Sequence, residues 1–294
     1  MQYASMLSYS IMVNDDSNIT LIAGDTHLHP AFLERISYAA DAVNANRIIL
    51  LGDYMDYWHA NTAQYVGMAE ALKDWMDNDK RAIDLLLGNH DIPYYTGSND
   101  PLFSFIKYRA VGMNMLAVND VHEIYSMMRM RVSTTLVNPV NNDVYICTHA
   151  GLTLGWLNKY CKSKIGKSYD AYVISDLLNE MQAHGEWRAL YSCGALRGGH
   201  DGNPGPLWAD KNELDSDPVI GVNQIVGHTP VNTIHIDLNT NASMVFCDTM
   251  SFMSNDKSIG DGSLLVVGDD SVSSSNSAYM VHHMAPGLHI LTMK

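Results

Sequence analysis

Polar residues that could bind divalent metal ions follow short apolar runs at five points of the sequence. Each run is rich in Ile, Leu, Val, Tyr or Cys, and the residues after it include Asp, Asn or His. Strands that end in this way project oxygen and imidazole nitrogen ligands from one edge of a sheet, where they can converge on cations. The five segments are Gly24-Asp25-Thr26-His27, Gly52-Asp53-Tyr54-Met55-Asp56, Gly88-Asn89-His90-Asp91, Thr148-His149-Ala150-Gly151 and Gly227-His228-Thr229-Pro230.

The segments together contain the ligands that a pair of metal ions requires. Two ions bridged by one carboxylate need hard oxygens and borderline imidazoles, and a water between the ions is acidified to hydroxide near neutral pH. An Asp-x-His pair alone could equally be a turn with a capping aspartate. Five such segments are hard to explain as turns or plain core. Each buried polar side chain needs a partner to offset its desolvation, and a metal ion would be such a partner. In the simplest assignment Asp25 and His27 bind the first ion, Asp53 bridges, and Asn89, His149 and His228 complete the second.

The elements that would position these residues follow from the apolar pattern. Residues 30–44 and 62–78 have helical length and period, and they separate the first three predicted strands. This alternation favours parallel βαβ units, whose ligand sites lie off the carboxyl ends of the strands. The last third has short strands without helices, which favours antiparallel hairpins that form a second sheet. The predicted strands lie at about 19–23, 47–51, 82–87, 143–148, 222–226, 243–247 and 263–267.

Composition limits the class of protein. The 294 residues are 47% hydrophobic, enough for a sizeable core. No run is long and apolar enough for a membrane helix and no export signal is evident, so we expect a cytoplasmic protein. The four scattered cysteines predict reduced, structural thiols. The net charge of −14 disfavours an extended nucleic acid or a membrane as partner, whereas bound metals would make a pocket locally positive for a small phosphorylated substrate.

As an ordered set, the five segments resemble the calcineurin-like metallophosphoesterase superfamily, and most of all its phosphoprotein phosphatase branch of the bacterial and phage type. The resemblance spans residues 25 to about 230. It implies an α/β fold, a four-layer α/β/β/α sandwich in a single domain over residues 1–294, with an insertion at about 152–210 that forms a cap or pocket wall. It also implies two divalent metal ions as cofactors, with manganese as the first choice and iron or zinc as alternatives.

The resemblance also implies catalytic roles. His90 follows a metal ligand and Asp56 lies three residues beyond the bridging aspartate, and the two form an Asp–His dyad. An imidazole kept protonated by a carboxylate can protonate an alkoxide leaving group. Pro230 stands where many relatives carry a second histidine. The first ion therefore keeps an open coordination shell.

The usual phosphate-binding residues are absent from the chain. Tyr57 and Leu87 stand where the phosphatase branch carries arginines. Arg197, in the Gly-rich part of the insertion, is the best replacement, because a guanidinium binds phosphate oxygens bidentately. We also expect Tyr57 to be substrate-binding. Together with Trp58 it either packs at the rim or stacks on a ring of the substrate.

These observations favour a phosphomonoesterase that uses a metal-bridging hydroxide, namely a serine/threonine phosphoprotein phosphatase whose substrate is a phosphorylated protein or a small phosphate ester. The alternative is hydrolysis of a dinucleoside polyphosphate or another nucleotide. A nuclease is a third possibility, which the acidic composition and Pro230 disfavour. A metal-binding interaction module without catalysis fits poorly, because the ligands, His90 and Asp56 are all present.

Overall fold

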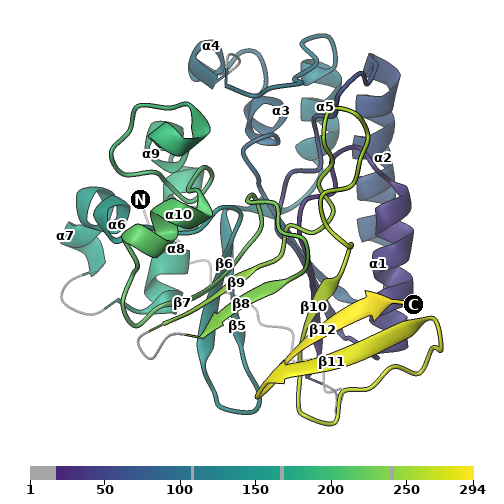
Figure 1. Cartoon of the computed structure of the whole chain (residues 1–294). Coiled ribbons are helices and arrows are strands. Elements are labelled where there is room, and N and C mark those ends of the chain that lie inside the picture. The colour runs from purple at the N-terminus through teal and green to yellow at the C-terminus, as the bar shows by residue number, and fades with distance from the viewer. Residues whose placement is uncertain (1–17, 107–108, 166–168, 239–241) are drawn as a thin grey trace, which may run out of the picture.

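The computed structural model describes residues 18–106, 109–165, 169–238 and 242–294. Two β-sheets lie face to face, and helices cover their outer faces (Figure 1). This confirms the predicted α/β sandwich of four layers.

The first sheet has seven strands in the order β11-β12-β10-β1-β2-β3-β4. Strands β1 to β4 are parallel, as the βαβ pattern predicts, and β10, β12 and β11 add antiparallel neighbours on the other side of β1. The strands are β1 (Thr20–Ala23), β2 (Arg47–Leu50), β3 (Ala82–Leu86), β4 (Met130–Arg131), β10 (Leu264–Val267), β11 (Tyr279–Ala285) and β12 (Leu288–Met293).

The second sheet has five strands in the order β5-β6-β7-β9-β8. Its three central strands β6, β7 and β9 are parallel, and the edge strands β5 and β8 are antiparallel to their neighbours. The strands are β5 (Ser133–Val137), β6 (Val144–Thr148), β7 (Asn223–Val226), β8 (His235–Leu238) and β9 (Ser243–Phe246).

Helices pack on both outer faces. Helices α1 and α2 contribute buried side chains to the core beneath the first sheet, and α8 contacts β5 and β6 of the second. A capping box at Asn61 and Gln64 fixes the start of α2. The helices are α1 (Ala31–Ala42), α2 (Thr62–Asn78), α3 (Ile92–Thr96), α4 (Phe103–Ile106), α5 (Val118–Tyr125), α6 (Leu154–Tyr160), α7 (Lys162–Ile165), α8 (Ala171–Ala183), α9 (Trp187–Leu190), α10 (Lys211–Ser216) and the short 3-10 helix η1 (Ala195–Arg197).

Successive side chains of a strand point to opposite faces of its sheet, and those on the inner faces form the core between the sheets. Ile22, Ile49 and Leu86 of the first sheet pack against Cys147 and Val245 of the second. The neighbouring residues of each strand point to the opposite face and the helices. All four cysteines are free and buried, which agrees with reduced, structural thiols. Among the described residues, no helix is long and apolar enough to cross a membrane.

The seven predicted strands are present, each within one residue of the predicted ends. The prediction for the last third was wrong in one respect: β10, β11 and β12 join the first sheet, whereas β7, β8 and β9 join the second. Leu265 and Val267 of β10 enter the core between the sheets, while Leu264 and Val266 enter the core under the helices. A strand buried on both faces in this way is stabilised in a central position beside β1.

Candidate metal centre and active site

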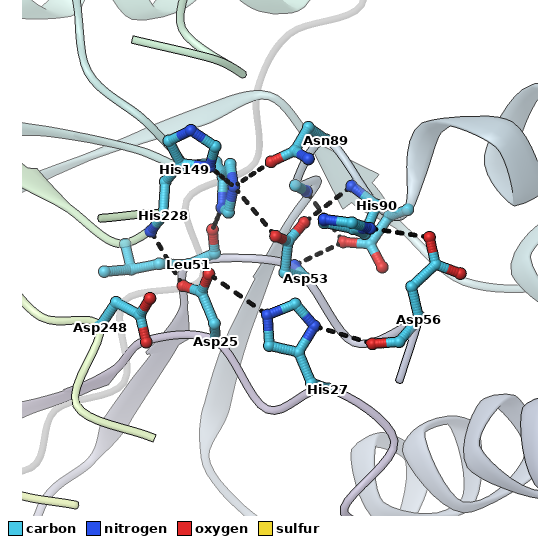
Figure 2. Close-up of polar contacts among 12 residues, drawn as sticks. Asp25, His27, Leu51, Asp53, Asp56, Asn89, His90, His149, His228 and Asp248 are labelled. Atoms are coloured by element: carbon cyan, nitrogen blue, oxygen red, sulfur yellow. Dashed lines mark hydrogen bonds and ion pairs between the residues drawn. The ribbon is translucent and has the colours of Figure 1, made fainter. Parts of the chain in front are cut away.

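The six predicted ligands converge at the carboxyl ends of the central strands of both sheets (Figure 2). Their donor atoms form two groups that share Asp53, and within each group the atoms lie within 4.8 Å of one another. The first group holds Asp25 and His27, and the second holds His149 and His228. Asn89 adjoins the second group, because its Oδ1 lies 2.9 Å from His149 Nε2. A shared carboxylate between two ligand sets is the arrangement that a bridged pair of ions needs.

Backbone carbonyls orient two of the histidines. His149 Nδ1 donates to the carbonyl of Leu51 at 2.9 Å, and His27 Nδ1 donates to the carbonyls of Met55 and Asp56 at 3.1 and 3.0 Å. Both rings therefore keep the Nε2 lone pair free toward the cluster. Carbonyl contacts of this kind fix the tautomer and orientation of a metal-binding histidine.

Close backbone approaches explain why a glycine precedes several ligands. A Cβ at Gly88 would lie 2.0 Å from Asp53 Oδ1, and one at Gly227 would lie 2.5 Å from Asp25 Oδ1. Tight loops also hold Asp53 and His228 at φ values of 55° and 62°, which are uncommon for residues with a side chain. Such conformations cluster at functional sites, where the surrounding structure maintains them.

The charge of the cluster fits bound cations. Five aspartates at the site are at most 4% exposed, and buried carboxylates are costly unless they are paired or coordinate metals. Burial, with the charges of Asp248 and Asp53, raises the pKa of Asp25 well above its usual range. His149 Nε2 and His228 Nδ1 lie 3.1 Å apart, close enough for both nitrogens to bind one ion. The donor set therefore fits two divalent ions. The five aspartates are Asp25, Asp53, Asp56, Asp91 and Asp248.

His90 and Asp56 form the predicted dyad geometry. His90 Nδ1 lies 2.7 Å from Asp56 Oδ2, and the Tyr94 hydroxyl donates to Asp56 Oδ1 at 2.6 Å. Burial lowers the pKa of His90, but the carboxylates of Asp53 and Asp56 outweigh it and raise the pKa to about 9. The two carboxylates therefore favour the protonated form of the imidazole.

Arg197 and Tyr57 line the same cavity as the ligands, which has a volume of about 240 Å³. Arg197 Nη2 donates to Thr229 Oγ1 at 3.0 Å, and its Nε lies 2.8 Å from Asp210 Oδ2. The Tyr57 hydroxyl donates to Asp256 at 2.5 Å, and this contact raises the pKa of Tyr57 to about 12. Both predicted substrate-binding residues therefore lie beside the metal ligands.

The sequence interpretation gave no role to two aspartates that the structure places at the site. Asp248 follows β9 and lies beside Asp25 in Figure 2. The predicted strand at 243–247 followed by an acid was the available signal. Asp91 accepts hydrogen bonds from the backbone amides of Asp53, Tyr54 and Gly88 at 2.7, 3.0 and 2.8 Å. It therefore organises the loop that carries Asp53.

Two sheets with carboxylates and imidazoles gathered where their strands end are typical of a metal-dependent hydrolase. The sequence model of the calcineurin-like phosphoesterase family matches residues 20–232. The chain therefore belongs to this family and is a metal-dependent phosphoesterase.

Solved structures similar to the chain include several phosphatases. The cold-active protein-tyrosine phosphatase of a psychrophile, Shewanella sp., is 14% identical, with a TM-score of 0.45 over 90% of this chain and 77% of that chain. The phosphatase domain of the Legionella effector WipB is 21% identical, with a TM-score of 0.35 over 55% of this chain and 64% of that chain. The protein TT1561 of Thermus thermophilus is 10% identical, with a TM-score of 0.35 over 85% of this chain and 94% of that chain. A search of curated proteins finds no match.

Proposed function

We propose that the protein is a dinuclear-metal phosphomonoesterase and that it acts as a serine/threonine phosphoprotein phosphatase. The observation that carries the proposal is the pair of ligand groups that share Asp53, with the His90–Asp56 dyad beside them. Asp25, His27 and Asp53 would hold one ion, and Asp53, Asn89, His149 and His228 the other. Bound there, two divalent ions would supply an activated water and would neutralise charge on the phosphoryl oxygens.

Residues of the chain would bind the phosphate and protonate the leaving group. Arg197 would bind an oxygen of the phosphate, anchored by Thr229 and Asp210. His90 would donate its proton to the departing serine or threonine oxygen, and Asp56 would hold the ring in place and favour its charged form. Tyr57 would contact the substrate at the edge of the cavity.

We infer that the segment at about 152–210 is an insertion within one metallophosphoesterase domain and forms a wall of the pocket. Its helices α6 to α9 lie on one side of the sandwich (Figure 1). Arg197 and Trp208 of this segment line the cavity, and Trp208 packs edge-on against His228 with ring centroids 5.5 Å apart. This part of the pocket would exclude water from the phosphate. The attraction between Arg197 and the phosphate would then be stronger.

The test is hydrolysis by protein that is stripped of metal and then reloaded with manganese. We expect release of phosphate from a phosphoserine peptide only after reloading, at a rate well above that from diadenosine tetraphosphate. Iron and zinc are compared in the same assay. Faster cleavage of the dinucleotide would replace the proposal with a nucleotide phosphohydrolase, and no hydrolysis of any phosphate ester would overturn it.

A further inference from the structure

A buried tyrosine holds the second oxygen of the Asp56 carboxylate. Asp56 Oδ2 faces His90 Nδ1 at 2.7 Å (Figure 2), and Asp56 Oδ1 accepts a hydrogen bond from the Tyr94 hydroxyl at 2.6 Å. Both Tyr94 and Asp56 are buried. A buried carboxylate needs hydrogen-bond partners, because it has left the water that would otherwise solvate it. With one partner on each oxygen, the plane of the carboxylate that faces His90 is fixed.

The backbone fixes the direction of the hydrogen bond from Tyr94. The amide of Asn114 donates to the Tyr94 hydroxyl oxygen at 2.9 Å. That oxygen is therefore the acceptor toward Asn114, and its own proton is directed at Asp56. Burial and the Asp56 carboxylate also raise the pKa of Tyr94, which keeps the hydroxyl protonated. Tyr94 is thus a dedicated donor to Asp56.

The ring of Tyr94 is held from two sides, behind the cavity. Tyr94 lies in α3, four residues after His90, and its amide donates to the carbonyl of Asp91 at 3.0 Å. Its ring lies 5.8 Å from that of Tyr65, whose hydroxyl donates to the carbonyl of Gly112 at 2.5 Å. The described residues that line the cavity include His90 and Asp56 but not Tyr94. Tyr94 can therefore act on a substrate only through Asp56.

We propose that Tyr94 is a positioning residue for protonation of the leaving group, because it holds Asp56 in the orientation that fixes the His90 ring. The inference rests on the proposed function, in which His90 is the proton donor. Since His90 Nδ1 is bound to Asp56, the proton would pass from Nε2 to the departing oxygen, and the neutral ring would regain a proton from water. The effect of Tyr94 must then depend on how strongly the leaving group needs a proton.

The test compares Tyr94→Phe with the manganese-loaded wild type on a phosphoserine peptide and on nitrophenyl phosphate. We expect kcat for the peptide to fall about tenfold, while its KM and the kcat for the nitrophenyl ester change by less than about twofold. Tyr125→Phe is the matched control, because the Tyr125 hydroxyl donates to another buried aspartate, Asp91, at 3.1 Å. Asp91 organises the loop of Asp53, so this variant should change both esters by the same factor. Equal losses for the two esters in Tyr94→Phe would overturn the proposal.

A double variant separates positioning from a general structural role. In the His90→Asn background, Tyr94→Phe should cause no further loss on the peptide, because the two residues act through one proton transfer. A further loss of about tenfold there would overturn the proposal. The wild type alone also tests the contact, even if Tyr94→Phe does not fold. A neutron crystal structure should show the hydroxyl deuteron of Tyr94 directed at Asp56 Oδ1, and a deuteron that points elsewhere would contradict the proposal.

Failure of the proposed function is a separate result. Faster cleavage of diadenosine tetraphosphate, with unequal losses on the two esters in Tyr94→Phe, would defeat the proposed function and leave the role of Tyr94 in place. Hydrolysis of the phosphoserine peptide with equal losses in Tyr94→Phe would do the reverse.

Discussion

At the scale of single residues, the contacts of His90 support its proposed role as a proton donor. His90 binds Asp56 through Nδ1, and its backbone amide donates to Asp53 Oδ1 at 2.9 Å. The ring is therefore tied both to a carboxylate that keeps it charged and to the bridging ligand. A proton donor in this position matters most when the leaving group is a strong base.

We expect His90→Asn to keep its metal ions and to lose about 10²- to 10⁴-fold in the rate of alkyl phosphate hydrolysis. Hydrolysis of a nitrophenyl ester should fall much less, because nitrophenolate leaves without a proton. The measurements are kcat for both esters and the metal content of the variant. Equal losses for the two esters would argue against the acid role of His90.

In the proposed mechanism, binding of the phosphate depends on Arg197, because Tyr57 and Leu87 provide no guanidinium. We predict that Arg197→Ala raises KM for phosphate esters by about tenfold, the effect of one lost charge-assisted contact. Arg197→Lys should recover part of the loss. Arg188→Ala removes an exposed arginine outside the cavity and serves as the control. Unchanged kinetics in Arg197→Ala would remove the residue from the site.

Only part of the candidate site could be predicted from the sequence. That the six proposed ligands, His90 and Asp56 lie together was predictable, because polar residues follow apolar strands that are easy to recognise. Asp248 likewise follows a predicted strand, at 243–247, but no glycine or histidine accompanies it, so this one signal did not separate it from an ordinary turn residue. The ring contacts of Phe252 were not predictable either, because its partners His29 and Tyr57 lie about 200 residues earlier in the chain.

At the scale of elements, the loops after β2 and β3 set the position of the bridging carboxylate. Gly88→Ala would place a Cβ 2.0 Å from Asp53 Oδ1 and 2.4 Å from its backbone nitrogen, so the loop must shift. We predict that this variant loses its metal ions, as measured by elemental analysis. Gly67→Ala in α2, where a Cβ meets nothing within 4 Å, should keep them and gain up to about 1 kcal/mol in stability. A fully metal-loaded Gly88→Ala protein would contradict this account of the loop.

The hairpin of β11 and β12 contains a pH-sensitive pair. His283 Nδ1 lies 2.8 Å from Nδ1 of the buried His289, so one ring must donate and the other accept. Burial and the neighbouring His283 lower the pKa of His289 in the folded protein, although the carbonyl of Asp269 opposes this. The unfolded chain then binds the proton more readily. Stability from this group is complete above the unfolded pKa of about 6.5 and falls as the pH drops below it.

We therefore expect acidification from pH 7.5 to pH 5.5 to lower the melting temperature of the wild type more than that of His289→Gln, by about 2 °C or more. His184→Gln changes a histidine whose side chain is 61% exposed, and it should retain the full pH dependence. Identical pH dependence in wild type and His289→Gln would show that the pair has no such effect.

Pairing between elements limited the sequence prediction of the fold. The parallel strands β1 to β3 were predictable from local alternation with helices. The sheet that β10 joins was not, because it depends on pairing between Leu21 and Val266, which are far apart in the chain. Strands β11 and β12 were not among the predicted strands. In β11, a run of exposed residues that includes His282, His283 and Met284 interrupts the apolar pattern.

At the scale of the whole molecule, the two sheets bring into one site residues that lie far apart in the sequence. Asp25 and His228 come from different sheets, and the backbone amide of His228 donates to Asp25 Oδ1 at 3.0 Å. The chain carries a net charge of −14, and buried aspartates at this junction add to the repulsion. Bound cations would offset that repulsion and link the two sheets.

The most direct test of two metal ions sharing Asp53 is anomalous diffraction at the manganese edge from crystals grown with manganese. We predict two peaks, one beside Asp25 and His27 and the other beside His149 and His228, with Asp53 between them. Asp53→Asn should lose both peaks or weaken them together. A single peak in the wild type, or two peaks that persist unchanged in Asp53→Asn, would contradict the shared-carboxylate centre.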